Sequence, residues 1–350
     1  IQKMIERGEI DSRGATINSS QIQPASLDLR LGIVAYRVRA SFLTCRNFTV
    51  NDRLQEFEMH KIDLTKGAIL EKGCVYIIPL MEYLDLPKNV SAASNAKSSI
   101  GRLDLLTRVI TDNGIEFDRI NNGYKGPLYA EICPRSFSVL ARPKQRLNQI
   151  RFRIGQSVID DDGLKRMHAS DPLVNGEALI DEGLGFSVDL KPKENNLVGF
   201  VAKPHTNIID LDQIDHYNPN DFWQQVRTSS GQIILDPGAF YILVSREAVN
   251  IPSNCAAEMA PYIAMIGEFR VHYAGFFDPG FGNKESGGIG SRGVLEVRCH
   301  EAPFVLEHGQ NVGRLIYEKM IETPNILYGQ DLKSNYQGQG LKLSKHFKSY

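Results

Sequence analysis

The stretch KSSIGR, residues 97–102, brings together residue types that bind phosphate. Two adjacent hydroxyls, Ser98 and Ser99, lie between the cations Lys97 and Arg102. Hydroxyls and backbone N–H groups of a tight turn can donate to phosphate oxygens while flanking cations neutralise the charge. A simpler interpretation is that the serines begin a helix or turn and that both cations are solvated. Context must decide between the two.

Two glutamates form the second set of residues whose type and spacing could support catalysis. Glu131 lies in LYAEICP and Glu296 lies in VLEVRC, 165 positions later. A lone glutamate in a strand is most simply an outward-facing polar residue. Its recurrence in a repeat favours a function, because a surface position has little reason to keep the same acid twice. One glutamate can act in turn as base and as acid when water replaces an amino group.

The separation of 165 positions recurs along the chain. GAILEKGCVYIIP (67–79) aligns with QIILDPGAFYILV (232–244), so that Gly73 matches Gly238 and Tyr76 matches Tyr241. This register predicts a duplicated domain. We expect a first domain over residues 1–165, a polar connecting segment over 166–180 and a second domain over 181–350.

The elements that must position these residues are predicted to be mainly strands. Short apolar runs such as CVYIIPL, LYAEI, FSVL and AFYILV are bounded by Gly, Pro, Asn or Lys at intervals of roughly 8–12 residues. This spacing is typical of an antiparallel barrel or sandwich, with few and short helices. The opening IQKMIERGEI predicts one such helix, ending at Gly8. KSSIGR follows an apolar run and is predicted to begin a short helix or turn.

Composition limits the partners and the location. Forty basic and forty-one acidic side chains among 350 residues give a net charge of −1, so no global field indicates a nucleic acid or a membrane. No apolar run approaches the roughly 20 residues of a membrane helix, and no leader opens the sequence. Five scattered cysteines fit reduced thiols. We therefore expect a cytoplasmic protein.

Four segments together make a family resemblance. QPASLDLRLG (23–32), NAKSSIGRLDLL (95–106), GYKGPLYAEI (123–132) and SNYQGQG (334–340) resemble, in this order, the motifs of deoxycytidine triphosphate (dCTP) deaminases, relatives of the trimeric deoxyuridine triphosphatases. The duplication is a departure, because the usual member has one such domain. The resemblance implies two tandem distorted β-barrels of the dUTPase-like type. It also implies a homo-oligomer with nucleotide sites at the seams between domains.

The resemblance implies hydrolysis of dCTP to deoxyuridine triphosphate (dUTP) and ammonia. Lys97, Ser98, Ser99 and Arg102 would hold the phosphates and order the reacting centre, and Glu131 or Glu296 would activate water. The other expected substrate contacts are Asp118, His272, Ala274, Asp278, Tyr328, Tyr336 and Gln339, of which the last three belong to a tail that closes over the nucleotide. Asp28 of SLDL has a simpler interpretation, in which it holds a turn or pairs with Arg30.

We expect no metal ligands in the chain. Many nucleobase deaminases hold zinc with an H-x-E motif followed by P-C-x-x-C, and this sequence has neither. CHEAP (299–303) places Cys299, His300 and Glu301 side by side, but adjacent strand residues point to opposite faces and no C-x-x-C follows. Mg²⁺ is expected to arrive with the triphosphate.

The two copies differ in what they retain. If IGE (266–268) corresponds to IGR (100–102), the second copy has Ala264, Met265 and Glu268 in place of the two serines and the arginine. That copy keeps the turn HYAGFFDPGF (272–281), which the first copy interrupts as TDNGIEFDRINNGYKG, where Asp118 or Asp112 would match Asp278. KSSIGR could therefore work with Glu296 or with Glu131 of another chain's first copy. The sequence leaves both arrangements open.

Two other functions remain open at this point. A dUTP pyrophosphatase, or an enzyme with both activities, could share the fold, because fold does not fix function. The tail NYQGQG differs, however, from the glycine-rich R-G-x-x-G-F-G-S-T-G tail of the pyrophosphatases. A non-catalytic nucleotide sensor would suit the degenerate second copy, but Ser98, Arg102 and Glu131 are intact in the first.

Overall fold

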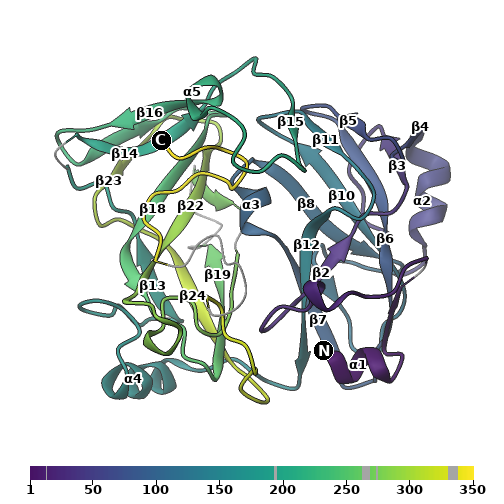
Figure 1. Cartoon of the computed structure of the whole chain (residues 1–350), viewed down its shortest axis with the longest axis horizontal. Helices are drawn as coiled ribbons and strands as arrows, with labels where there is room; N and C mark the ends of the chain where they lie inside the picture. Colours follow the sequence, from purple (N-terminus) through teal and green to yellow (C-terminus); the bar gives the residue numbers. More distant parts are fainter. Residues whose placement is uncertain (13, 193–194, 262–268, 273–274, 330–337) are drawn as a thin grey trace. The chain divides into compact units, whose positions relative to one another are not determined.

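The structure is a computed structural model that describes residues 1–12, 14–192, 195–261, 269–272, 275–329 and 338–350, with the backbone alone described at 261 and 269–272. It is mainly β with a few short helices, as the sequence predicted (Figure 1). The chain divides into two compact units. Unit 1 contains Ile1–Gln156 and Thr206–Tyr217, and unit 2 contains Ser157–His205 and Asn218–Tyr350.

Unit 1 consists of three sheets. The largest has the order β4 (Glu58–Asp63), β3 (Val34–Val38), β6 (Val75–Asp85), β10 (Lys125–Pro134) and β8 (Leu105–Thr111), with β1 (Ile10–Ser12) also pairing with β6. The second has the order β2 (Leu27–Arg30), β12 (Arg146–Ile154), β7 (Val90–Ala96) and β9 (Arg119–Ile120). The third joins β5 (Ala68–Leu70), β11 (Val139–Ala141) and β15 (Ile209–Asp210).

Unit 2 repeats this plan. Its largest sheet has the order β16 (Trp223–Arg227), β14 (Leu197–Ala202), β18 (Phe240–Val249), β22 (Ser291–Cys299) and β20 (Phe269–His272). The second has the order β13 (Leu184–Ser187), β24 (Asn311–Lys319), β19 (Cys255–Pro261) and β21 (Phe276–Phe277), and β17 (Gln232–Leu235) pairs with β23 (Phe304–Glu307). Each strand neighbour in these three sheets has its counterpart in unit 1.

The strand register confirms the duplication. Glu131 lies opposite Ile77 in the pairing of β10 with β6, and Glu296 lies opposite Ile242 in the pairing of β22 with β18. Buried polar contacts repeat as well. The Tyr76 hydroxyl accepts from the Glu71 backbone N–H at 3.0 Å, and Tyr241 accepts from that of Asp236 at 2.9 Å. The spacing of 165 positions is therefore a spacing of equivalent sites in two copies of one fold.

The α-helices have local causes. Helix α1 (Gln2–Glu6) precedes Gly8, whose φ of 73° stops a helix easily. Helix α2 (Val50–Phe57) was not predicted; a reciprocal cap between Thr49 and Asp52 begins it, and Val50 and Leu54 are buried. The remaining α-helices are α3 (Ser98–Gly101), α4 (Asp161–Ser170) and α5 (Pro219–Phe222). None of the helices in the described ranges has the length and apolarity needed to cross a bilayer.

Unit 2 begins at Ser157, before the boundary expected at residue 165. Residues 157–165 belong to unit 2, because Ile159 and Leu164 pack into its core. A second difference is that residues 206–217 belong to unit 1 although the chain on both sides belongs to unit 2. Strand β15 pairs there in parallel with β11, and Arg142 Nη1 lies 2.6 Å from Asp210 Oδ1.

Candidate functional site

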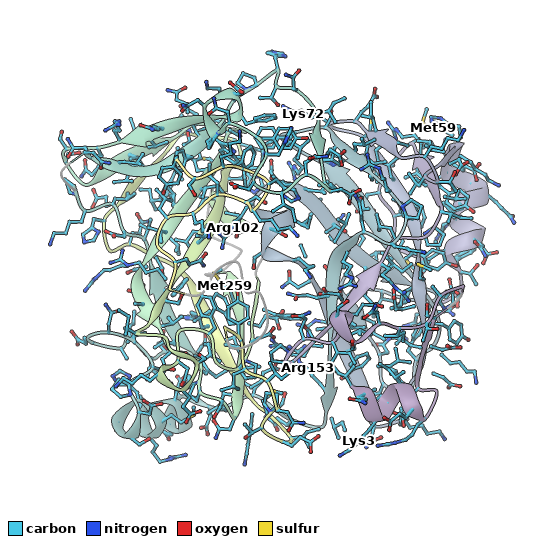
Figure 2. All side chains as sticks on the ribbon, viewed as in Figure 1. Lys3, Met59, Lys72, Arg102, Arg153 and Met259 are labelled. Carbon is cyan, nitrogen blue, oxygen red and sulfur yellow. The ribbon has the colours of Figure 1, made fainter. Side chains whose placement is uncertain are left out.

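The KSSIGR motif forms the single turn of α3. Strand β7 leads into it, Lys97 is its extended N-terminal cap residue, and Arg102 is its last cap residue. Ile100, which is 3% exposed, anchors the turn in the core. Arg102, labelled in Figure 2, is only 2% exposed. The serines therefore begin a helix, as one interpretation held, but Arg102 is not a solvated cation.

Lys97 is held by the aspartate of the SLDL motif. Its Nζ forms an ion pair with Asp28 Oδ2 on β2, and Arg146 Nη1 lies 3.8 Å from the same oxygen. The expectation that Asp28 pairs with Arg30 was wrong, because Arg30 Nε lies 2.7 Å from Glu82 Oε1. Asp28 thus fixes the lysine at the start of α3, which leaves the other N–H groups of the ammonium for a ligand.

The chain after α3 is fastened to the end of the strand that carries Glu131. The Ser136 hydroxyl donates to Asp104 Oδ2 at 2.6 Å, and the Arg135 backbone N–H donates to the Asp104 carbonyl at 3.0 Å. Asp104 is 1% exposed and has a φ of 52°. These contacts join the chain after the motif to the chain after β10.

Glu131 is buried and paired. It is 1% exposed and lies opposite Arg108 in the pairing of β10 with β8. Its Oε1 accepts from Arg108 Nη2, and from Arg108 Nε at 3.2 Å. Its Oε2 is buried and has no hydrogen-bond partner among the described residues. No hydrogen bond or ion pair joins Glu131 to Ser98 in the part of the chain that the structure describes.

Asp118 holds a turn in the first copy. Its Oδ1 accepts from the Val109 backbone N–H at 2.8 Å, and its own N–H donates to the Val109 carbonyl at 2.9 Å. Its φ of 60° is one that aspartate tolerates better than most side chains. Asp112 accepts instead from the Val50 N–H at the start of α2, at 2.8 Å.

The corresponding turn of the second copy meets the C-terminal tail. The Tyr328 N–H donates to the Pro279 carbonyl at 2.8 Å, and the Tyr328 ring centroid lies 5.5 Å from that of Phe281. A Cβ on Gly280 would lie 2.8 Å from Leu327 Cβ, so the glycine permits this approach. Asp278, 8% exposed, lies in the same turn. The structure thus places Tyr328 against the turn that contains Asp278.

Gln339 meets the strand of the second glutamate. Its Nε2 donates to the Arg292 carbonyl on β22 at 3.1 Å, and the Arg292 N–H donates to the Gln339 carbonyl at 3.2 Å. Glu296 lies four residues further along β22, is 4% exposed, and is in register with Ile242 and His272. Two of the three predicted tail residues therefore contact the second copy.

The sequence reasoning missed two arginines. Arg292 forms an ion pair with Asp189 of the SVDL motif, as Lys97 does with Asp28 of SLDL. The repeated S-x-D-L motif was the available signal, because a buried aspartate in each copy needs a cation. Arg108 carried no signal in the sequence, because its role follows from its position opposite Glu131.

Some predicted residues lie outside the described part. These are Tyr336 and Ala274, together with the second copy's Ala264, Met265 and Glu268. For His272 the structure describes only the backbone, which pairs with β22.

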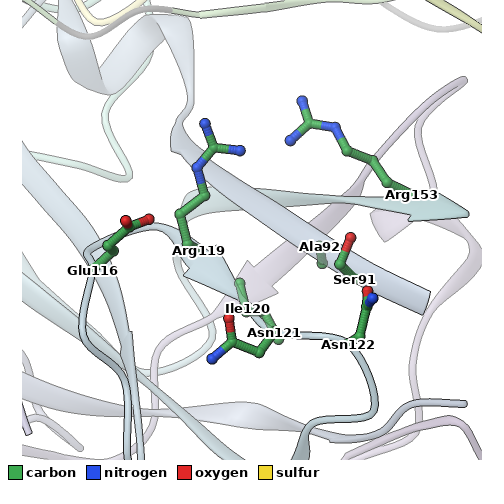
Figure 3. A pocket seen from close by; sticks show the side chains of 8 residues that line it. All are labelled: Ser91, Ala92, Glu116, Arg119, Ile120, Asn121, Asn122 and Arg153. Carbon is green, nitrogen blue, oxygen red and sulfur yellow. The ribbon is translucent and has the colours of Figure 1, made fainter. Parts of the chain in front are cut away.

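A separate open cavity lies on unit 1. Its volume is about 620 Å³, and it is lined by Ser91, Ala92, Glu116, Arg119, Ile120, Asn121, Asn122 and Arg153. Figure 3 shows that the guanidinium groups of Arg119 and Arg153 rise on the same side of the strands that carry them. None of the predicted site residues lines it. All five cysteines are free, and no group of three potential metal ligands occurs among the described side chains.

The comparisons with known proteins agree across both units. A family profile described as the 2'-deoxycytidine 5'-triphosphate deaminase N-terminal domain matches residues 1–156, and the C-terminal domain of the same family matches residues 160–347. A crystal structure of 2'-deoxycytidine 5'-triphosphate deaminase from Agrobacterium tumefaciens is 52% identical. It covers 91% of this chain and 97% of its own, with a TM-score of 0.88.

Shorter curated relatives also match. The "dCTP deaminase, dUMP-forming" of Nanoarchaeum equitans is 30% identical over 173 residues, which is 44% of this chain and 81% of the relative. The protein of the same description from Aquifex aeolicus is 28% identical over 186 residues, which is 49% of this chain and 94% of the relative. These shares are what a relative with a single copy of the fold would give. Since one family's two domains match nearly the whole length, the chain belongs to the 2'-deoxycytidine 5'-triphosphate deaminase family.

Proposed function

We propose that this chain is an enzyme that deaminates dCTP to dUTP and ammonia. The observation that carries the proposal is the intact KSSIGR turn, with Arg102 buried and Lys97 fixed by Asp28, in a chain of this family. A buried arginine, a fixed lysine and two hydroxyls form a suitable set of donors for a triphosphate.

The reaction needs one water and one proton shuttle. A glutamate takes a proton from water, and the resulting hydroxide adds to C4 of the cytosine ring. The same carboxyl group then gives that proton to N3 of the ring, and the proton of the new C4 hydroxyl passes to the exocyclic nitrogen, which leaves as ammonia while the C4 carbonyl forms. The overall reaction converts dCTP and water into dUTP and ammonia. Glu131 and Glu296 occupy equivalent strands, and one of them would serve.

The substrate would be the Mg²⁺ complex of the triphosphate. Mg²⁺ binds phosphate oxygens and keeps several waters, so the protein has to supply only the remaining cations and hydroxyls. Lys97, Ser98, Ser99 and Arg102 would supply these on the phosphate side. Asp278, His272, Ala274, Tyr328, Tyr336 and Gln339 would contact the sugar and base, with Asp118 as the first copy's counterpart of Asp278.

We also place the enzyme in the cytoplasm as a homo-oligomer with no nucleic-acid partner. The balanced charge supports the absence of a nucleic-acid partner, and the family resemblance supports the oligomer, because it implies sites at seams between domains. Size measurement in solution would test the oligomer, since a monomer at micromolar concentration would contradict it.

A second candidate is an enzyme that also hydrolyses the dUTP it makes. The specific observation in its favour is that the relatives from Nanoarchaeum equitans and Aquifex aeolicus are named dUMP-forming. The test is to incubate the chain with dCTP and Mg²⁺ and to assay ammonia and pyrophosphate separately. Ammonia alone supports the deaminase, and equal amounts of both support the two-step enzyme. Binding of dCTP without either product would reject both in favour of a sensor.

A further inference from the structure

The tail meets the strand that carries Glu296 at Arg292, near the start of β22. Gln339 Nε2 donates to the Arg292 carbonyl at 3.1 Å, and the Arg292 N–H donates to the Gln339 carbonyl at 3.2 Å. Both hydrogen bonds use the backbone of Arg292, whereas its guanidinium pairs with Asp189. Two bonds to one residue fix both the main chain and the side-chain amide of Gln339 on β22.

The equivalent position of the first copy cannot bind the tail in this way. Arg292 lies opposite Ala248 in the pairing of β22 with β18. Pro127 lies opposite Tyr83 in the pairing of β10 with β6. Both members of the two pairs are 165 positions apart, so Pro127 is the counterpart of Arg292. Proline has no N–H, and the Pro127 carbonyl already accepts from the Tyr124 hydroxyl at 2.7 Å.

In the second copy a phenylalanine takes the place of Tyr124. The Leu86 N–H donates to the Tyr124 carbonyl at 2.9 Å. The Ile251 N–H, 165 positions later, donates to the Phe281 carbonyl at 2.9 Å, so Phe281 is the counterpart of Tyr124. Phenylalanine has no hydroxyl, and this position therefore cannot supply the donor that Tyr124 supplies. The Arg292 carbonyl binds the amide of the tail instead.

The chain beyond Gln339 is held on unit 2 by other contacts. Phe347 is 5% exposed, and its ring centroid lies 5.4 Å from that of Phe222 and 5.9 Å from that of Trp223. Loss of the hydrogen bonds to Arg292 should therefore release Gln339 while the C-terminus stays packed. The bonds to Arg292 thus set the position of one side chain, and the attachment of the tail does not depend on them.

We propose that the backbone of Arg292 positions Gln339 for dCTP. The same place on the first copy is closed by Pro127 and Tyr124. The inference rests on the proposed function, in which Gln339 contacts the nucleotide. A side chain that is already held on β22 loses less conformational entropy when it binds a substrate. An amide has a second N–H and a carbonyl oxygen, so the bond to Arg292 still allows a substrate contact. Arg292 is therefore a positioning residue.

Two substitutions at position 292 separate the backbone from the side chain. Arg292→Pro and Arg292→Ala both remove the ion pair with Asp189, but only proline also removes the N–H that binds Gln339. The first copy has proline at this position, and β10 keeps its pairing with β6 there. We expect KM for dCTP to be about 5- to 30-fold higher in Arg292→Pro than in Arg292→Ala. The two kcat values should agree within about threefold, because the lost contact serves ground state and transition state alike.

Trypsin measures the docking of the tail without any substrate. Lys342 is exposed and lies three residues after Gln339, so cleavage after Lys342 should be several-fold faster in Arg292→Pro than in Arg292→Ala. Gln339→Ala removes the bond to the Arg292 carbonyl and should also speed this cleavage relative to the parent. Thermal melts would show which variants are folded, and Gln339→Ala tests the docking even if Arg292→Pro does not fold.

The outcomes separate the inference from the function on which it rests. A parent protein that releases no ammonia from dCTP rejects the deaminase proposal and the inference together. If the parent is active, equal cleavage rates in Arg292→Pro and Arg292→Ala reject only the inference, because the backbone of Arg292 then does not hold the tail. Faster cleavage in Arg292→Pro without a higher KM also rejects it, because the docking then does not position Gln339. If Arg292→Pro does not fold, unchanged cleavage of Gln339→Ala has the same meaning.

Discussion

Burial distinguishes the cations at the ends of the KSSIGR motif. The side chain of Lys97 is 27% exposed and paired with Asp28, whereas Arg102 is 2% exposed. Because its ammonium group is partly exposed, Lys97 can turn toward a phosphate without a large desolvation cost. A buried guanidinium is already desolvated and oriented, so it adds more to binding of a developing charge. We therefore expect Arg102 to contribute more than Lys97 to kcat/KM for dCTP.

Replacement of Arg102 tests this at the residue scale. Arg102→Gln keeps a polar side chain with N–H donors but removes the charge, and it should lower kcat/KM for dCTP by about 10³-fold or more. Arg46→Gln is the matched control, because Arg46 is exposed and carries the same charge. A thermal melt should show both variants folded. Parent-like turnover by Arg102→Gln would return KSSIGR to a purely structural helix start.

Burial should also make the cysteine thiols differ in reactivity. Burial raises the pKa of Cys255 to about 11, and Cys299 is also buried, whereas Cys45 is exposed. Only the thiolate reacts with iodoacetamide, so at about pH 8 Cys45 should be alkylated first and Cys255 last. Mass spectrometry of the native protein over time would show the order. Early labelling of Cys255 would mean that this part of unit 2 opens.

At the element scale, strand β10, which carries Glu131, is tightly packed at its start. A Cβ on Gly126 would lie 2.5 Å from the Tyr124 hydroxyl oxygen, which is the far end of a side chain that is itself fixed. That hydroxyl donates to the Pro127 carbonyl at 2.7 Å and accepts from the Asp112 N–H at 3.3 Å. Burial raises the pKa of Tyr124 far above its ordinary value.

Gly126→Ala should therefore destabilise the protein. We expect a loss of about 1–3 kcal/mol in the free energy of unfolding, because the methyl group displaces Tyr124 from its hydrogen bonds. Gly340→Ala is the control, since nothing lies within 4 Å of its Cβ position, and should change stability by less than about 0.5 kcal/mol. Urea unfolding followed by fluorescence would measure both. Equal stability of the two variants would show that β10 tolerates a shift at its start.

For the whole molecule, the duplication divides the work between the copies. The first copy keeps the KSSIGR turn, for which we propose phosphate binding, and in the second copy the turn that contains Asp278 and strand β22 contact the tail. A single-copy relative must place every function in one domain, whereas a fused chain can lose each function once. The copies share their strand order and register, whereas the KSSIGR sequence occurs in the first copy alone.

Metal removal tests the chemistry at this scale. A chelator that removes Mg²⁺ should weaken dCTP binding, because the free triphosphate carries more charge than the donors can neutralise. A zinc-selective chelator should leave turnover unchanged, since the sequence lacks the H-x-E and P-C-x-x-C motifs of zinc deaminases. Equilibrium binding and ammonia release, measured with each chelator, would check this. Activity that returns only with added zinc would contradict a mechanism without zinc.

The sequence alone determined the mainly β class, the duplication and the family. It could do so because strand register is rigid: paired residues such as Glu131 and Ile77 keep their spacing in both copies. The start of α3 was also readable, since helix starts depend on local residues. Helix α2 was missed although the cap of Thr49 and Asp52 and the apolar pair Val50 and Leu54, four positions apart, were available signals of its start.

Only the tertiary structure decided how the site residues are partnered. Arg108 and Glu131 meet across two strands, and Lys97 at the start of α3 meets Asp28 on β2, so no local pattern predicts either pair. The same holds for residues 206–217, whose strand β15 joins β11 of unit 1. Local chemistry and repeat spacing are written along the chain. Which charge neutralises which depends on contacts between distant segments, and these exist only after the chain has folded.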